Sequence, residues 1–193
     1  MRKAVLALVA ASLLLAALAP AAAARATRTD FVGFVFPAGA FPVPGVTCPT
    51  DIVGPLPGCY LELGRTVTLE NGGLLMRDFK VMDVSLAWDT PANVVAHMDQ
   101  PNVPGRTGYI IESFNANLDA SGYGPVWGSW ELHDFASTAL MFSGHFTGTL
   151  GPDGFNVQQN AIGHGDFKNQ HMWASVVPGS INLTGEILDT HPD

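Results

Sequence analysis

Apolar and polar residues alternate in short runs over most of the chain after residue 30. Runs such as 109–118 and 126–133 place apolar side chains at every second position, and Gly, Pro, Asn or Asp residues bound them. A period of two is typical of β-strands with one face in a core. The 3.6-residue period of an amphipathic helix is nearly absent, so the pattern predicts an all-β protein.

The predicted strands are 31–36, 60–70, 74–79, 82–88, 94–98, 109–118, 126–133, 140–150, 155–163, 172–177 and 181–187. The turns at 70–73 and 151–154 place Asn, Asp or Gly where a hairpin needs positive φ, which predicts antiparallel pairing. Several strand glycines permit coiling and bulges. We therefore expect a small closed antiparallel β-barrel of about eight strands, with a β-sandwich or jelly roll as the alternative.

The first residues have the pattern of an export signal. Arg2 and Lys3 precede an uncharged apolar run at 4–18, and small residues follow around Pro20. This order predicts a helical signal peptide at 1–26, cut after Ala26 or after Ala24, although an uncleaved membrane anchor remains the alternative. We expect a secreted protein, extracellular or periplasmic, whose residues 27–193 form one domain.

Charge narrows the range of partners. Removing residues 1–26 takes three of the nine basic residues and none of the 17 acidic ones, so the formal charge falls from −8 to −11. Such a surface repels phosphates, which argues against nucleic acid. It also disfavours anionic membranes, and we expect no stable membrane insertion after processing.

Cys48 and Cys59 are the only cysteines of the chain. Two nearby thiols in an exported protein usually pair, and their spacing does not fit a CxxC redox or zinc motif. We expect a disulfide that closes a short loop rich in turn formers and contributes about 3 kcal/mol.

One segment resembles a known family. Residues 160–168 form a predicted strand that ends in Gly-x-Gly-x-Phe before the apolar Met172-Trp173-Ala174, and 105–109 and 142–150 are similarly punctuated by glycine. This part of the chain resembles dirigent and allene oxide cyclase-like barrels. It departs from them in having Ile162-Gly163-His164-Gly165 where the dirigent pattern runs Gly-Gly-Thr-Gly. The resemblance implies a fold, and it carries no catalytic or binding residue onto this chain.

Glu112 is the best single candidate for a catalytic residue. It shares a strand face with Ile110, Phe114 and Ala116. Burial on that face would raise its pKa and suit general acid or base chemistry. Two alternatives stay open: Glu112 lies at a barrel rim, or the other face, with Ser113, Asn115 and Asn117, lines a polar interior.

Metal and nucleophile motifs are missing. Glu131 with His133, and His164 with Asp166, each share a strand face, but apolar residues occupy the opposite faces, so we expect these pairs to be solvated. The chain has no HExxH, no HxH pair and no Gly-x-Ser-x-Gly elbow. We predict no metal site and no cofactor.

The large aromatic side chains suggest a hydrophobic pocket. Trp88, Tyr109 and Trp130 are candidate walls, and the loops 99–104 and 121–125 are candidates for its mouth. The leading hypothesis is a barrel that binds an apolar or amphipathic small molecule. The alternatives are an isomerase, cyclase or hydrolase-like enzyme in the same cavity, and a structural or surface-interaction module without a pocket.

Overall fold

A computed structural model describes residues 26–38, 47–56, 58–88, 108–176, 178 and 182–191. The predicted signal peptide, apart from Ala26, the predicted strand 94–98 and the predicted loop 99–104 lie outside these residues. Within the described ranges, no helix has the length and apolar character that crossing a membrane requires.

The described chain is all-β, as predicted, apart from 3₁₀ conformation at Ala38 and in the turn η2 (Gly165–Phe167). Its strands are β1 (Thr27–Pro37), β2 (Tyr60–Glu62), β3 (Arg65–Thr68), β4 (Leu74–Trp88), β5 (Gly108–Leu118), β6 (Gly124–Asp134), β7 (Leu140–Gly151), β8 (Gly154–Gly163), β9 (Gln170–Val176) and β10 (Asn182–Asp189).

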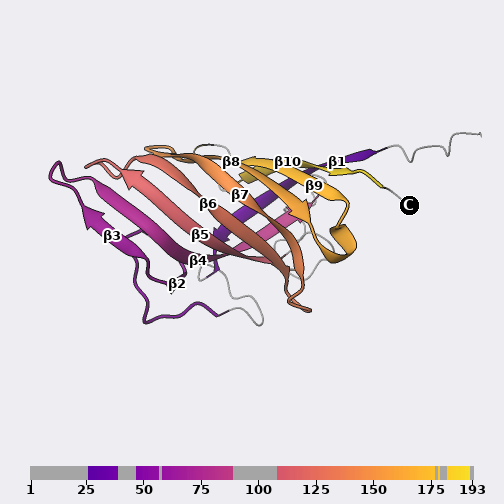
Figure 1. The fold of residues 1–193 in the computed structure, drawn as a ribbon, viewed down its shortest axis with the longest axis horizontal. Coiled ribbons are helices and arrows are strands. Elements are labelled where there is room, and N and C mark those ends of the chain that lie inside the picture. Colours follow the sequence, from indigo (N-terminus) through magenta and orange to yellow (C-terminus); the bar gives the residue numbers. More distant parts are fainter. Residues whose placement is uncertain are drawn as a thin grey trace, which may run out of the picture.

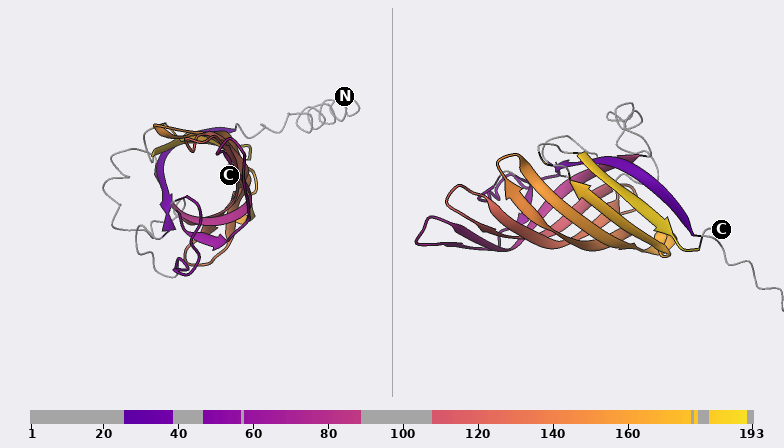
Figure 2. Two further views of the ribbon diagram at one scale, coloured as in Figure 1. Left: turned by 90° about the vertical axis from the view of Figure 1, so that its left-hand side faces the viewer. Right: turned by 90° about the horizontal axis from the view of Figure 1, so that it is seen from above.

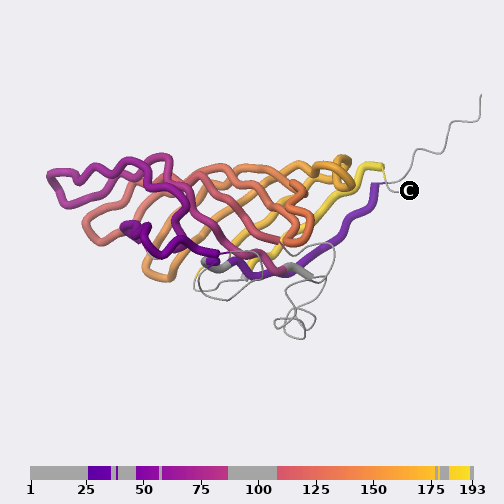
Figure 3. The backbone as a smooth tube through the Cα atoms, turned by 90° about the horizontal axis from the view of Figure 1, so that it is seen from below, coloured from indigo at the N-terminus to yellow at the C-terminus, as the bar shows by residue number. Residues whose placement is uncertain are grey.

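The strands form one antiparallel sheet that closes on itself. Neighbours pair in the order β1-β10-β9-β8-β7-β6-β5-β4, and β1 also pairs with β4, which completes a ring of eight strands. Figure 2 (left) looks along this ring, and Figures 1 and 3 show the strands crossing the long axis obliquely, as closure of a sheet requires. The alternative sandwich would need two facing sheets.

Two predicted boundaries are wrong around β4. The predicted strands 74–79 and 82–88 are one strand, because a bulge between Met76 and Phe79 shifts the register against β5 and interrupts the alternation. At the bulge Asp78 has φ 58°, and its N–H donates to Asn115 Oδ1 at 3.0 Å. Conversely, the predicted strand 60–70 is divided into β2 and β3. Gly64 lies between them, where a Cβ would come 1.9 Å from the Arg77 carbonyl oxygen.

The interior is packed by rows of side chains from successive strands. In one row Phe114, Gly128 and Phe146 lie opposite one another on β5, β6 and β7. The two phenyl rings stack across the glycine, with centroids 6.3 Å apart and planes 22° apart. A large side chain also packs against a glycine where the Phe31 ring faces Gly185. Large side chains therefore fill space that glycines leave open.

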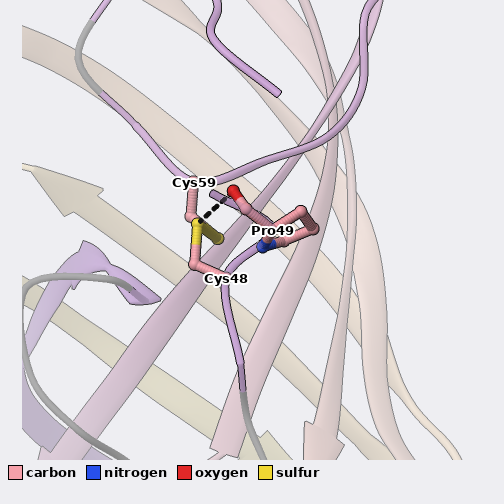
Figure 4. The surroundings of a disulfide bond; sticks show 3 residues. All are labelled: Cys48, Pro49 and Cys59. Carbon is pink, nitrogen blue, oxygen red and sulfur yellow. Dashed lines mark hydrogen bonds between the residues drawn. A yellow bond between two sulfur atoms is a disulfide. The ribbon is translucent and has the colours of Figure 1, made fainter. Parts of the chain in front are cut away.

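A second apolar cluster lies on the outer face of β4. Met82, Val84, Leu86 and Cys59 are buried in it, and none belongs to the interior cluster. Cys59 forms the predicted disulfide with Cys48, as Figure 4 shows beside Pro49.

The loop that the disulfide closes also contacts the interior. Ile52 and Leu56 pack against the interior cluster, to which Tyr60 belongs. The Leu56 N–H donates to the Tyr60 hydroxyl at 3.3 Å. β1 pairs with only the last six residues of β4, Asp83–Trp88, and β2, which follows this loop, pairs with Lys80 and Val81 where β1 does not reach.

We predict that Gly128→Ala destabilises the fold by about 2–3 kcal/mol, because the new Cβ overpacks the interior. It would lie 1.9 Å from the Ser113 carbonyl oxygen and 2.6 Å from the Phe146 ring. Urea unfolding measures the change. Gly151→Ala is the matched control, since the nearest atom is 4.0 Å from its Cβ. Equal stabilities of the two variants would contradict this account of the packing.

Candidate functional site

Glu112 faces the interior of the ring. Along β5 the buried side chains are Ile110, Phe114 and Ala116, and Glu112 is in phase with them. The prediction that this face is the apolar one is confirmed. The alternative, in which Ser113, Asn115 and Asn117 line a polar interior, is wrong because these residues lie on the outer face.

A second carboxyl group lies beside Glu112. Asp83 on β4 is opposite Ile110, and Val81 is opposite Glu112, so the two acids are diagonal neighbours on the interior face. Burial raises the pKa of Asp83 to about 6. Burial, followed by the negative charge of Asp83, raises the pKa of Glu112 well above its usual value. Two like charges inside one apolar space cannot both ionise easily.

Asp83 and Glu112 each keep an intermediate share of accessible surface, although protein atoms surround both carboxyl groups densely.

Trp130 completes this polar group. It lies directly opposite Glu112 on β6, and Gly144 and Ala161 follow it in the same interior row. These small residues leave room for the indole, which is 3% exposed. Its Nε1 is the one buried side-chain nitrogen or oxygen, within the described ranges, that has no hydrogen-bond partner. An unpaired buried donor of this kind costs about 1–3 kcal/mol.

A small cavity adjoins Trp130, and neither Asp83 nor Glu112 lines it. It has a volume of about 30 Å³, and its walls are mostly apolar, with Ser85, Gln159 and Trp130 as the residues that carry side-chain hydrogen-bonding groups. Space of this size accepts one or two water molecules, and these polar groups are suitable partners for them.

Sequence reasoning missed Asp83 and Tyr60. In the segment 81–86 the strongly apolar residues are Met82, Val84 and Leu86, which suggests that this side is the core. The structure turns these residues outward into the second cluster and turns Asp83 and Ser85 inward. Burial raises the pKa of Tyr60, and the charge of Asp83 adds to that rise, which places the phenol near the acid pair.

The predicted pocket walls are only partly brought together. Trp130 lies in the interior, but Tyr109 faces outward, where its ring stacks on His133 with centroids 5.1 Å apart. Tyr109 is therefore not a wall of the interior. Trp88 pairs with Val32 through its backbone, and its side chain lies outside the described part of the structure. The loop 121–125 joins β5 to β6, with Glu112 in the middle of β5.

Glu131 and His133 lie on the outer face of β6, where His133 Nε2 is 3.2 Å from Glu131 Oε2, but the expected solvation is wrong for His133, whose side chain is 16% exposed. The expectation that His164 and Asp166 share a strand face is also wrong, because β8 ends at Gly163 and Asp166 lies in η2. His164 Nε2 is 2.7 Å from Ser143 Oγ. Among the described residues, no group of three or more His, Cys, Asp or Glu side chains is arranged to hold a metal ion.

Comparison with protein-family models, with curated proteins and with solved structures finds no match to this chain.

We predict that the acid pair makes the protein less stable as the pH rises. The folded-state pKa of each acid is above its unfolded value, so the folded state holds protons that the unfolded state has lost. The stabilisation is present below pH 4 and is lost as the pH rises through about 6 for Asp83 and through the raised pKa of Glu112. At pH 7, Asp83→Asn should therefore raise the free energy of unfolding by about 1–3 kcal/mol relative to wild type.

Urea unfolding between pH 4 and pH 8 measures this difference, which should shrink towards pH 4. Asp78→Asn is the matched control, because Asp78 lies on the same strand but is exposed. A constant difference between wild type and Asp83→Asn at every pH would show that Asp83 is not the titrating group.

Proposed function

We propose that the protein is an exported β-barrel that binds a small amphipathic molecule inside the ring. The polar end of the ligand would lie among Asp83, Glu112 and Trp130, and its apolar part would contact side chains such as Ile110 and Phe142. The observation that carries the proposal is the unpaired Trp130 Nε1, directly opposite Glu112 on the interior face of the ring.

The cost of these polar groups supports a ligand. A buried donor without a partner and two carboxyl groups with raised pKa values all destabilise the folded protein relative to apolar residues of similar size. One molecule with a hydroxyl or carbonyl group would satisfy Trp130 and a protonated carboxyl at once. The same side chains have no comparable use in a core that serves only for packing.

The size of the cavity restricts the ligand. Because the cavity beside Trp130 has a volume of about 30 Å³, a molecule larger than water would have to displace the side chains that line it. Met172, which borders the cavity, is the most adaptable of them, since its three rotatable bonds let it refill irregular space. Small ligands with one polar group are therefore favoured over long lipids.

Export and family resemblance belong to the same proposal. The disulfide is consistent with an oxidising compartment, which supports processing at Ala24 or Ala26 and secretion. The resemblance to dirigent and allene oxide cyclase-like barrels stays an expectation that rests on residues 105–109, 142–150 and 160–168 of the sequence.

We predict that small alcohols and ketones bind to residues 27–193 and raise the melting temperature, and that Trp130→Phe weakens their binding about three- to tenfold through the loss of one hydrogen bond. A graded panel from propanol and acetone to cyclohexanol and cyclohexanone is tested by thermal shift and calorimetry. Trp173→Phe is the matched control on the outer face and should bind like wild type. Absence of binding across the panel, or equal loss in both variants, would contradict the proposal.

A proton-transfer enzyme is the second candidate, because burial raises the pKa of two neighbouring acids on the interior face. When only one acid of such a pair is ionised, the ionised carboxylate can accept a proton and the protonated carboxyl can donate one. Neighbouring acids whose pKa values are pushed apart are a common arrangement for acid and base roles. A base that removes a proton next to a carbonyl, assisted by a donor to the carbonyl oxygen, fits this pair.

We predict that the protein then catalyses exchange of the α-protons of cyclohexanone with deuterium in D₂O, followed by NMR. Asp83 would take the α-proton while Glu112 donates a hydrogen bond to the oxygen, and deuterium returns from solvent to carbon. Asp83→Asn should lower the exchange rate about 100-fold or more. Asp78→Asn should leave it unchanged. If ketones bind but exchange no faster than in buffer, the protein is a binder and not this enzyme.

A further inference from the structure

A groove crosses the outer face of the ring from β6 to β9, on the other side of the sheet from the acid pair. It has a volume of about 510 Å³. One side of the groove is a row of residues that lie opposite one another in register: Ser129, His145, Asn160 and Trp173. Because they belong to four adjacent strands, the row follows the groove from end to end.

The opposite side is the neighbouring row, formed by Glu131, Ser143, Ile162 and His171. The rows are two residues apart along each strand, so backbone of inward-facing residues forms the floor between them. Four strands about 4.8 Å apart give a length of about 14 Å, which suits a short oligosaccharide better than a single small molecule.

Apolar surface is concentrated at the β8–β9 end of the groove. Trp173 is 43% exposed and Ile162 is 51% exposed, which is unusual for side chains of this size. His171 stacks on Trp173, with centroids 6.1 Å apart and planes 23° apart, and this contact helps to hold the indole in place. An exposed aromatic ring with a restricted orientation is preorganised to stack on a flat, weakly polar surface of a ligand.

Hydrogen-bonding groups line the rest of the groove. His145 and Asn160 are exposed, and Asn160 can both donate and accept. The Glu131 carboxylate, an acceptor, is held by His133 at 3.2 Å. The lining has no Lys or Arg.

We propose that this groove binds a neutral oligosaccharide. A pyranose has a C–H face that stacks on an aromatic ring and an edge of hydroxyl groups that need both donors and acceptors. Trp173 supplies the ring, and Asn160, His145 and Glu131 supply the polar contacts. A polyanion would meet a carboxylate and no Lys or Arg, and an apolar peptide would leave the amide, imidazole and carboxylate groups unpaired.

Affinity gel electrophoresis of residues 27–193 tests the proposal, with soluble hydroxyethyl cellulose, xylan, glucomannan, laminarin and glycol chitosan in separate gels and polygalacturonate as the polyanion. At least one neutral polysaccharide should retard the protein. Trp173→Ala should reduce that affinity about tenfold or more, as expected for a central aromatic contact. Phe155→Ala is the matched control, because Phe155 is similarly exposed, at 40%, but lies outside the groove.

Asn160→Ala tests the polar part of the groove and should also weaken retardation by the neutral polysaccharide. Circular dichroism should show that each variant keeps its β-sheet spectrum. The proposal is overturned if no neutral polysaccharide retards the protein, if only polygalacturonate does, or if Trp173→Ala and Phe155→Ala behave alike. The interior variant Asp83→Asn, whose residue does not line the groove, should retain full retardation, which keeps this test separate from that of the interior site.

Discussion

The whole architecture depends on one strand that pairs on both sides. Residues 27–34 of β1 pair with β10, and residues 32–37 pair with β4, so only three residues of β1 have both neighbours. This pairing joins the first and last strands of the sheet and removes two edges that would otherwise expose unpaired backbone groups. It also converts one face of the sheet into a closed interior. Closure determines which face of each strand lies inside the ring, and the burial of Asp83 and Glu112 follows from it.

Closure also explains why acidic groups are buried. β4 carries an apolar side, with Met82, Val84 and Leu86, and a mixed side, with Val81, Asp83 and Ser85. The second cluster covers the apolar side from outside, with the disulfide at Cys59 as part of that cover. The mixed side is then directed into the ring. The polar side chains inside the ring and the apolar cluster outside it therefore depend on each other. If Met82, Val84 and Leu86 faced the interior, the apolar residues of the second cluster that pack on them would become exposed.

The sequence predicts some of these features and not others for identifiable reasons. Glu112 was found because β5 alternates cleanly and both of its neighbours pair along its whole length. Gly72, with φ 81°, confirms the turn chemistry expected at 70–73. Asp83 was missed, and Tyr109 was assigned to the wrong face, because apolar residues on β4 and β5 are buried by a second cluster outside the ring. Local alternation of apolar and polar residues indicates that one face of a strand is buried. Which element covers that face depends on contacts between residues that are distant in the sequence.

The interior site and the outer groove are separated by a single layer of backbone. The row of Trp130, Gly144, Ala161 and Met172 points inward, and the backbone of the same row forms the floor of the groove. A side chain at Gly144 is excluded from within the sheet, because its Cβ would lie 1.8 Å from the Asn160 carbonyl oxygen and 2.8 Å from the Ala161 Cβ. The groove floor depends only on the hydrogen-bonded ladder, which does not change when an interior side chain is shortened. The two faces can therefore hold chemically different ligands, and a change of interior side chain alters the one site while leaving the other intact.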